Sequence, residues 1–391
     1  MKFNLSELVK IVNGYAFKSA DIISDQSAYV IKIKNIQSSK ILLEKDSMTA
    51  EMDGLNKYQI KFNDILISLT GSGMNQMSSA VGKVGRFRHT QKAYLNQRVA
   101  KISSLDEAKL TNDYLYYFIN RPEIQKDLVS VATGSANQVN ISPKIIGELS
   151  IDLPDLAEQE RITNILTAFD SKIEILESIN DNLLELGITY TEELLVEHEY
   201  PVSTIKSMNL TVSDHVANGS FKALKDNVEI VENSGYALFL RNTDLKADLN
   251  GDRRFVTENS YEFLKKSRLF GGEVIISNVG DVGSVYHVPY LDVPMVAGNN
   301  VVFLQSEESW LTDYLYFYFK SRIGQHDIDS ITSGSAQQKF NKTDFRALEI
   351  PVIPEHDVTI LTKLIDNLNS NTREIRTLMD TRDALLKKLL N

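Results

Sequence analysis

Amide and guanidinium side chains stand together in two short segments of the chain, Asn96-Gln97-Arg98 and Asn299-Asn300. Such planar groups form paired hydrogen bonds: asparagine and glutamine match the major-groove edge of adenine, and arginine matches that of guanine. The two segments are therefore candidates for reading nucleic-acid bases. The alternative is structural, because polar residues at strand ends also cap turns.

Two glycine-rich loops offer groups that hold phosphates. The first, residues 71–85, contains Ser72, and three cations lie within it or just beyond it: Lys83, Arg86 and Arg88. The second, residues 280–284, contains Ser284, follows Asn278 and has none of those cations. Backbone N–H groups, hydroxyls and cations bind phosphate oxygens and position a protein on nucleic acid. The alternative is an ordinary hairpin loop with solvated lysines.

A further pair of polar loops is nearly identical. Gly134-Ser135-Ala136-Asn137-Gln138 returns as Gly334-Ser335-Ala336-Gln337-Gln338, which Lys339 follows. Polar residues kept in two otherwise divergent segments indicate a shared task, such as positioning on a nucleic-acid backbone. A structural turn before a capped helix is the alternative.

The repetition runs along the whole chain. Residues 114–118 return as residues 314–318, 200 positions later, and the order of the other motifs is kept. The further pairs are residues 13–18 and 218–222, 29–35 and 236–242, 64–68 and 273–277, and 81–85 and 279–283. These pairs add Lys18, Lys222 and Arg241 to the candidate nucleic-acid contacts. A solenoid repeat spans only roughly 20–50 residues, so the sequence predicts two copies of a domain.

Each copy is predicted to be mixed α/β. Short β-branched runs between Gly, Asn and Asp predict strands. A short aromatic helix is expected to open at Asn112 in the first copy and at Thr312 in the second, and its rings are typical of a core rather than of base stacking. Ser142, before a proline, and Asn341 are predicted N-caps of a last short helix.

A long helix is predicted after each copy, because apolar residues recur in steps of three and four, as in a heptad seam. The seam residues are Ile162, Leu166, Phe169, Ile173, Leu176, Asn180 and Leu183 in the first helix, and Leu361, Ile365, Leu368, Ile375, Met379, Leu386 and Leu389 in the second. At about 40 residues the first helix would be roughly 60 Å long.

The two long helices are predicted to pair with each other, because a long amphipathic helix needs a partner for its apolar stripe. Pairing would be antiparallel if the two copies are related by a pseudo-two-fold axis. Asn180 could then fix the helix register, unless the seam opens to solvent there. The predicted organisation is a domain at 1–153, a helix at 154–199, a second domain at 200–353 and a helix at 354–391.

Charge is distributed unevenly. The net charge is −10, but residues 1–150 hold 19 basic and 14 acidic residues, whereas residues 151–200 hold 2 and 13. Because fields are screened within about 8–10 Å, the total charge does not exclude a nucleic-acid partner. The chain has no cysteine and no apolar run near the roughly 18 residues of a membrane span, so we expect a cytoplasmic protein without a membrane partner.

Motifs for catalysis are absent from the sequence. No P-loop, dinucleotide fingerprint, Gly-x-Ser-x-Gly elbow or metal-spaced histidine pair occurs among its 391 residues. Together with duplication and a helical spacer, this favours a binding protein that has no catalytic residues and no metal site.

The pattern resembles the specificity subunit of type I restriction–modification systems. The resemblance covers the whole chain, in the order domain, helix, domain, helix, and rests on several motifs. These are residues 14–19, residues 64–68 with the glycine-rich stretch after them, residues 96–99, and the run Leu153-Pro154-Asp155-Leu156-Ala157-Glu158-Gln159-Glu160-Arg161-Ile162. The second copy lacks Ala-Glu-Gln at the corresponding helix start, residues 351–357.

The resemblance implies a non-catalytic chain that binds double-stranded DNA. Each domain would read one half of an asymmetric bipartite site. The long helices would set the spacer and dock two modification subunits, which would carry S-adenosylmethionine, and restriction subunits could join the complex.

Two other functions remain open from the sequence. A scaffold that binds two protein partners through its helices would fit the net acidity, and it would show no salt-dependent DNA affinity. A nuclease with an unrecognised site would show metal-dependent cleavage by the chain alone.

Overall fold

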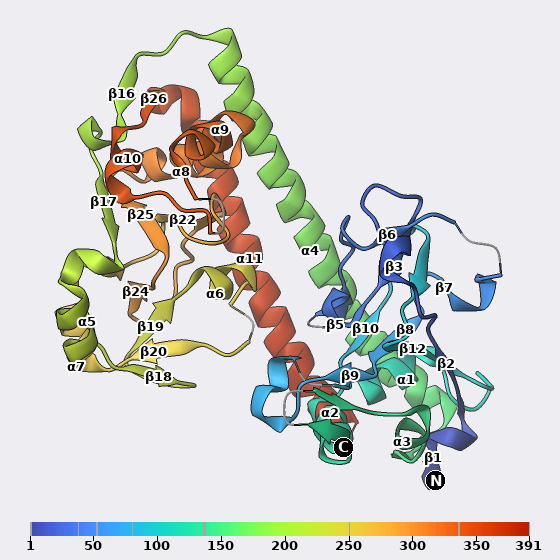
Figure 1. Cartoon of the computed structure of the whole chain (residues 1–391). Helices are drawn as coiled ribbons and strands as arrows, with labels where there is room; N and C mark the ends of the chain where they lie inside the picture. Colours follow the sequence, from blue (N-terminus) through green and yellow to red (C-terminus); the bar gives the residue numbers. More distant parts are fainter. Residues whose placement is uncertain are drawn as a thin grey trace. The chain divides into compact units, whose positions relative to one another are not determined.

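The computed structural model describes residues 2–37, 39–51, 54–79, 81–135, 138–249, 251–334 and 337–390, without the side chains of residues 75, 78, 79 and 135. The chain divides into two compact units, shown in Figure 1. The first unit comprises Met1–Lys172 and Leu378–Asn391, and the second comprises Ile173–Thr377. Each unit combines an α/β domain with a section of both long helices. The predicted class, mixed α/β with a long helix pair, is confirmed. The domain boundaries predicted at 153, 199 and 353 remain predictions.

In its described residues, the first unit contains four small sheets. The first sheet pairs β1 (Lys2–Asn4) with β15 (Ser150–Asp152). The central sheet has the order β2 (Val9–Asn13), β12 (Val99–Ser104), β8 (Ile65–Ser68), β10 (Val84–Arg86), β5 (Ser39–Ile41) and β4 (Ile36–Gln37). The other two sheets are β6 (Met48–Thr49), β3 (Ala28–Ile31), β11 (Ala93–Leu95) and β7 (Gln59–Ile60), and then β13 (Thr133–Ser135), β14 (Gln138–Asn140) and β9 (Thr70–Gly71). Its short helices are α1 (Asn112–Ile119), α2 (Pro122–Ser130) and α3 (Pro143–Gly147).

The second unit repeats this plan. In sheet order, its strands are β16 (Val202–Thr204) and β26 (Glu349–Pro351); β17 (Thr211–Asp214), β25 (Val301–Gln305), β22 (Val274–Ser277) and β23 (Val285–His287); and β18 (Ile230–Glu232), β20 (Arg254–Val256), β19 (Ala237–Leu240), β24 (Met295–Ala297) and β21 (Arg268–Leu269). Its short helices are α5 (Phe221–Asn227), α6 (Asn242–Lys246), α7 (Glu258–Phe263), α8 (Ser309–Lys320), α9 (Arg322–Ile331) and α10 (Lys342–Ala347).

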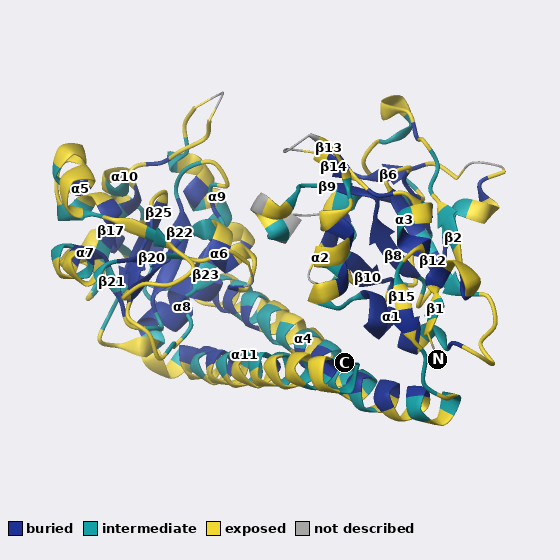
Figure 2. Ribbon diagram, turned by 90° about the horizontal axis from the view of Figure 1, so that it is seen from below, coloured by how far each residue is buried: buried dark blue, intermediate teal, exposed yellow. Residues whose placement is uncertain are grey.

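The central strands β8 and β22 are buried along their whole length (Figure 2). Their β-branched, apolar sequences suit a strand that is covered on both faces. The aromatic helices α1 and α8 pack in the same cores, as predicted, with Tyr114 and Tyr314 both buried. Burial raises the pKa of each phenol.

Helix α1 begins at Asn112, as predicted, but the predicted start of α8 at Thr312 was wrong. Helix α1 is capped by Thr111, whose hydroxyl accepts the Tyr114 N–H at 3.1 Å, and α8 begins earlier than expected, at Ser309. The caps of the last short helices lie where predicted: Ser142 accepts the Ile145 N–H at 3.3 Å, and Asn341 accepts the Asp344 N–H at 2.9 Å.

The long helices are α4 (Leu156–Glu197) and α11 (Glu355–Leu389), and within each unit their sections pack together. In the second unit the Asn371 amide donates to Asn180 Oδ1 at 2.9 Å, and the Tyr190 hydroxyl donates to the Asp357 carbonyl at 2.9 Å. The partner's number falls as the number along α4 rises, so the helices are antiparallel. The Asn180 hydrogen bond fits the predicted role of this residue in setting register. Every predicted seam residue is buried or half-buried.

The motif pair 13–18 and 218–222 does not correspond in space. The strand registers place Asn13 and Asp214 at matching positions of β2 and β17, so residues 218–222 lie several positions beyond their supposed counterparts. Phe17 is accordingly buried, whereas Phe221 is 86% exposed at the start of α5.

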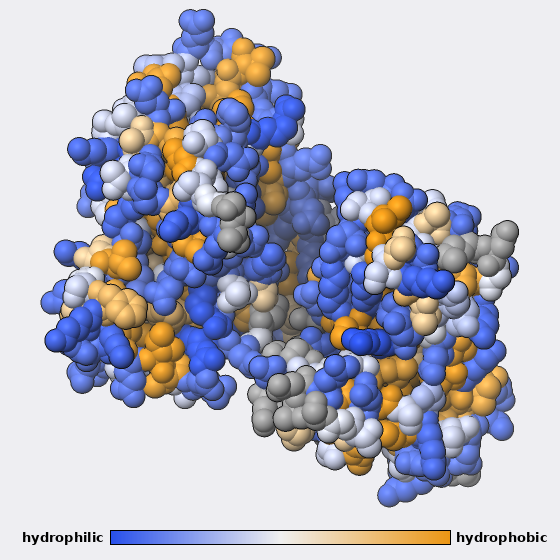
Figure 3. Space-filling view, in the orientation of Figure 1, coloured by the Kyte–Doolittle hydropathy of each residue, from blue (hydrophilic) through white to orange (hydrophobic). Residues whose placement is uncertain are grey.

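Within the described part of the chain, no helix is both long and apolar enough to cross a membrane. On the face shown in Figure 3, hydrophilic side chains cover most of the surface and apolar patches are small.

Candidate nucleic-acid interface

Three predicted segments of the first unit meet at one end of the central sheet. They are the link 96–98 between β11 and β12, the excursion 69–82 between β8 and β10, and the β13–β14 hairpin. Leu69 ties them together, because its N–H donates to the Arg98 carbonyl at 2.9 Å and its carbonyl accepts the Ile141 N–H at 3.0 Å. Strand β9 of the excursion also pairs with β14. We call this arrangement the three-segment junction.

The second unit builds the same three-segment junction around Asn278. The Asn278 N–H donates to the Asn300 carbonyl at 3.0 Å, and the Asn278 carbonyl accepts the Phe340 N–H at 3.1 Å. Here the excursion is shorter, residues 278–283, and single β-bridges replace the hairpin strands, with Val279 and Ser333 both facing Lys339. Segments that lie far apart in the sequence therefore converge in the same way in both units.

The two junctions gather most of the predicted nucleic-acid contacts. The exposed members are Gln97, Arg98, Gln138, Asn299, Asn300, Gln337, Gln338 and Lys339, and the half-buried members are Ser72, Lys83, Asn278 and Ser284. Asn137 and Ser335 lie outside the described residues, as does the side chain of Ser135. The junctions therefore present amides, hydroxyls and a few cations, which are donors and acceptors suited to base edges and phosphates.

Hydrogen bonding fixes which residues of the two excursions correspond. Ser68 and Ser277 end the matching strands, and their N–H groups donate to the carbonyls of Lys83 and Ser284, each at 2.9 Å. Lys83 therefore corresponds to Ser284, and the pairing of residues 81–85 with residues 279–283 was shifted by three positions. Sequence similarity gave the wrong pairing here because the dipeptide Val-Gly occurs twice within residues 279–283.

Arg86 belongs to the interior rather than to the junction. It is 9% exposed, its Nη1 lies 3.0 Å from Asp113 Oδ1, and its guanidinium lies 4.1 Å from the centre of the Tyr116 ring. These contacts hold the guanidinium inside the unit, so we remove Arg86 from the proposed DNA contacts.

Arg88 follows the opposite end of β10 from the junction. Its guanidinium lies 4.9 Å from the centre of the Phe62 ring and donates to the side chain of Asn63. The side chain of Asn96 is also withdrawn from the surface, because this residue is 7% exposed.

Three further predicted cations are not among the junction segments. The exposed Lys18 precedes the short 3-10 helix Ser19–Asp21, where its N–H donates to the Asp21 carboxylate at 3.0 Å. Lys222 is exposed on α5. Arg241 precedes α6 and forms an ion pair with Asp244 at 2.6 Å, and this hydrogen-bonded contact raises the pKa of Arg241.

The electrostatics of the two junctions differ. In the first unit, desolvation by burial lowers the pKa of the Lys83 ammonium. In the second, Asp281 lies within the excursion and Lys246 Nζ contacts its carboxylate at 2.9 Å, which lowers the pKa of that carboxyl. The second excursion therefore carries a negative charge that its own unit partly neutralises.

Two functional candidates were missed by the sequence reasoning. Gln125 on α2 and Gln325 on α9 each donate a side-chain N–H to a backbone carbonyl at the returning end of the excursion. A signal was present in the sequence, because the two glutamines are 200 positions apart, like the aromatic runs and the polar loops.

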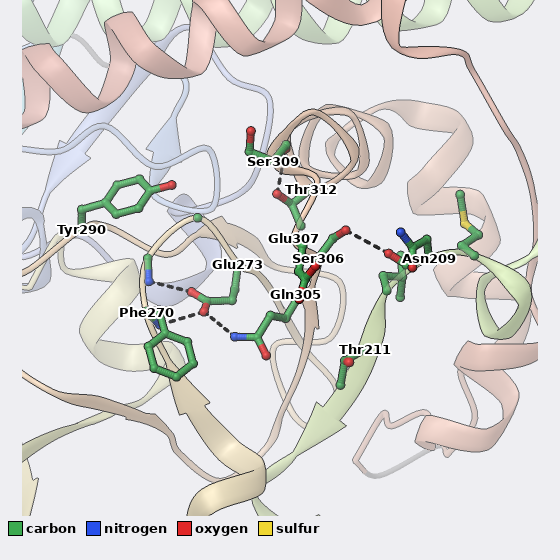
Figure 4. Close-up of a pocket in the computed structure, with 14 residues that line it drawn as sticks. Asn209, Thr211, Phe270, Glu273, Tyr290, Gln305, Ser306, Glu307, Ser309 and Thr312 are labelled. Atoms are coloured by element: carbon green, nitrogen blue, oxygen red, sulfur yellow. Dashed lines mark hydrogen bonds between the residues drawn. The ribbon is translucent and has the colours of Figure 1, made fainter.

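A hollow of about 700 Å³ lies at the other end of the second unit's central sheet (Figure 4). The carboxylate of Glu273, before β22, accepts the N–H groups of Phe270 and Gly271 at 2.7 and 2.9 Å and the Gln305 amide at 2.9 Å. These three hydrogen bonds engage both oxygens of the carboxylate, so its place is structural. Among the described residues, no group of three metal-ligating His, Asp or Glu side chains gathers.

The fold and the duplicated junction agree with the comparison to known families. The family model for the type I restriction modification DNA specificity domain matches twice, over residues 1–185 and 190–378. The chain therefore belongs to the family of type I restriction–modification DNA specificity proteins, and the two units contain its two recognition domains.

Specificity subunits of known proteins match nearly the whole chain in one case and less than half of it in another. A putative type I restriction enzyme MjaX specificity subunit from Methanocaldococcus jannaschii is 20% identical over 99% of this chain and 91% of its own length. The type I restriction enzyme MjaVIII specificity subunit from the same organism is 29% identical over 44% of this chain and 39% of its own length. The crystal structure of the S subunit from M. genitalium shares the fold, with a TM-score of 0.55 and 18% identity over 100% of this chain and 96% of that one.

Proposed function

We propose that this chain reads an asymmetric, bipartite DNA site, with each three-segment junction contacting one half. The observation that carries the proposal is that one backbone arrangement, built around Leu69 in the first unit and Asn278 in the second, presents different side chains. At the matched link positions Arg98 suits a guanine edge, whereas Asn300 suits an adenine edge. The two half-sites should therefore differ in sequence.

The two junctions should contribute differently to affinity. Lys83 and Arg98 offer cations in the first unit, and neutralising phosphates in this way gives salt-dependent attraction. In the second unit Ser284 and Asn300 occupy the matching positions. We infer that the first junction supplies more of the sequence-independent attraction and that the second relies on neutral hydrogen bonds.

The helix pair is the proposed spacer and docking surface. Its antiparallel sections are fixed by cross-helix contacts, such as Arg382 Nη1 to Asp170 Oδ1 at 2.8 Å in the first unit. In the proposed complex the chain is non-catalytic and cytoplasmic. Two modification subunits bind S-adenosylmethionine and transfer the methyl groups, and restriction subunits complete the assembly.

Mapping methylated motifs in DNA exposed to the assembled complex tests this function. The expected result is a single motif with two different specified halves around an unspecified spacer. A palindromic motif would contradict the assignment of different half-sites. DNA affinity that does not fall with added salt would contradict DNA reading altogether.

A further inference from the structure

The same glutamine holds the recognition excursion in both units. Gln125 Nε2 donates to the Val81 carbonyl at 3.3 Å, and Gln325 Nε2 donates to the Gly283 carbonyl at 2.9 Å. Val81 and Gly283 are one position apart in the corrected alignment, in which Gly82 matches Gly283. Each amide therefore reaches the same turn from a helix outside the central sheet.

The turn itself is built identically. Gly82 and Gly283 adopt φ of 82° and 85°, a backbone conformation that favours glycine. A Cβ atom at Gly82 would lie 3.2 Å from Leu128, and one at Gly283 would lie 3.0 Å from the Gln325 amide. The helix side chains therefore pack directly against each turn.

The opposite side of each turn is tied to the central strand. The N–H of Gly82 donates to the Ser68 carbonyl, and that of Gly283 donates to the Ser277 carbonyl, both at 3.0 Å. Strand and glutamine together fix where the excursion returns to the sheet. The excursions between these fixed points differ in length and composition, spanning residues 69–82 in the first unit and 278–283 in the second.

We propose that Gln125 and Gln325 are positioning residues for DNA reading, each setting the orientation of its own junction. This inference rests on the proposed function. Because the point where the excursion returns to the sheet is fixed, excursions of different length can start and end at the same positions of the sheet. Loss of the amide makes the excursion more mobile without removing any side chain that contacts DNA. Each glutamine should therefore control the accuracy of one half-site only.

The test uses the complex assembled with its modification subunits and the variants Gln125→Ala, Gln125→Met, Gln325→Ala and Gln325→Met. Methionine keeps most of the side-chain length and loses the amide's hydrogen bonds, which at Gln325 include one to the Phe319 carbonyl on α8. We measure methylation of the cognate site and of sites with one base changed in either half. In one half, each variant should discriminate against single-base changes roughly two- to tenfold less than the wild type does, which is the range for one hydrogen bond. The half relaxed by the Gln125 variants should be the one that the Gln325 variants leave intact.

Matched controls are Glu123→Ala on α2 and Asp329→Ala on α9, exposed residues on the same helices. Both controls should keep full discrimination in both halves. A purely structural role predicts a lower melting temperature with equal losses in both halves, or no change in discrimination, and either result would overturn the inference. If the wild-type complex reads no bipartite motif, the proposed function fails instead.

Discussion

Each unit places a basic, an acidic and a tyrosine side chain in the same arrangement, but these side chains are buried to different degrees in the two units. In the first unit Arg86 on β10 pairs with Asp113 on α1 over the ring of Tyr116. The Asp113 side chain is 55% exposed, so solvent screens this pair. Burial raises the pKa of Tyr116 to about 12, and the phenol is therefore neutral near pH 7.

In the second unit His287 on β23 takes the place of the arginine. Its Nε2 lies 3.4 Å from Asp313 Oδ1, and its ring centre lies 5.6 Å from that of Tyr316. Here both partners are enclosed, with side-chain exposures of 8% for His287 and 5% for Asp313. The comparison teaches that the units share backbone geometry rather than side chains, in the core as at the junctions.

Replacing the aspartate should give the largest difference in stability between the two units. Asp313→Ala should lower the free energy of unfolding of the second unit by about 1–3 kcal/mol, because it removes an enclosed polar group that contacts the buried imidazole of His287 at 3.4 Å. Asp113→Ala should cost less than about 1 kcal/mol, because the pair with Arg86 is screened by solvent. Trp310, the chain's one tryptophan, lies in the second unit, so its fluorescence in urea measures the loss for Asp313→Ala, and circular dichroism in urea measures the loss for Asp113→Ala. Equal losses for the two variants would contradict the difference in burial.

A second contrast concerns the aromatic residue that faces α4 in each unit. Phe317 packs so closely on Gly187 that a Cβ atom there would lie 2.2 Å from the ring. Gly187→Ala should therefore destabilise the second unit by about 1–3 kcal/mol through overpacking, despite the better helix propensity of alanine. The measurement is again Trp310 fluorescence in urea.

The matching first-unit variant serves as the control for this contrast. Tyr117, at the position of Phe317, donates its hydroxyl proton to Asp170 at 2.6 Å. Tyr117→Phe should cost about 1 kcal/mol through the lost hydrogen bond, visible by circular dichroism, and should leave the Trp310 transition in place. A shift of that transition would show that the units unfold together.

The junction links offer a functional contrast. Arg98→Ala should weaken cognate DNA binding by roughly tenfold or more and make the salt dependence shallower, since it removes a cation. Asn300→Gly should weaken binding without changing the salt slope, and glycine suits the φ of 65° at this position. Affinities measured across a salt series distinguish the two, and identical slopes for both variants would remove the proposed asymmetry.

The smallest expected effect comes from the acid in the second excursion. Asp281→Asn removes a carboxylate paired with exposed Lys246 and should strengthen DNA binding about twofold, an effect that is strongest at low salt. Glu232→Gln, at another exposed ion pair of the same unit, is the control and should leave affinity unchanged. Weaker binding by Asp281→Asn would indicate that the Asp281–Lys246 pair shapes the excursion.

Periodicity and repetition in the sequence predicted the helix pair and the mixed α/β class well, because both depend on patterns that persist over many residues. Register was harder to predict. Strand pairing determines that Lys83 corresponds to Ser284 and that Phe17 does not correspond to Phe221. The amino-acid sequence around these residues does not specify which strands pair or in which register. Arg86 was misplaced because its partner Asp113 comes from a distant helix. Gln125 carried a usable signal through its spacing from Gln325.

The composition of the first unit has a consequence for biosynthesis. The end of α11, from residue 378, and the following Leu390 belong to this unit: Leu386 lies in its core with Ile162 and Leu166, and the Arg121 guanidinium donates to the Leu390 carbonyl at 2.6 Å. On the ribosome these residues emerge after all of the second unit. Although domains generally fold in the order of synthesis, the earlier-made unit here can finish folding only after the later one has been released.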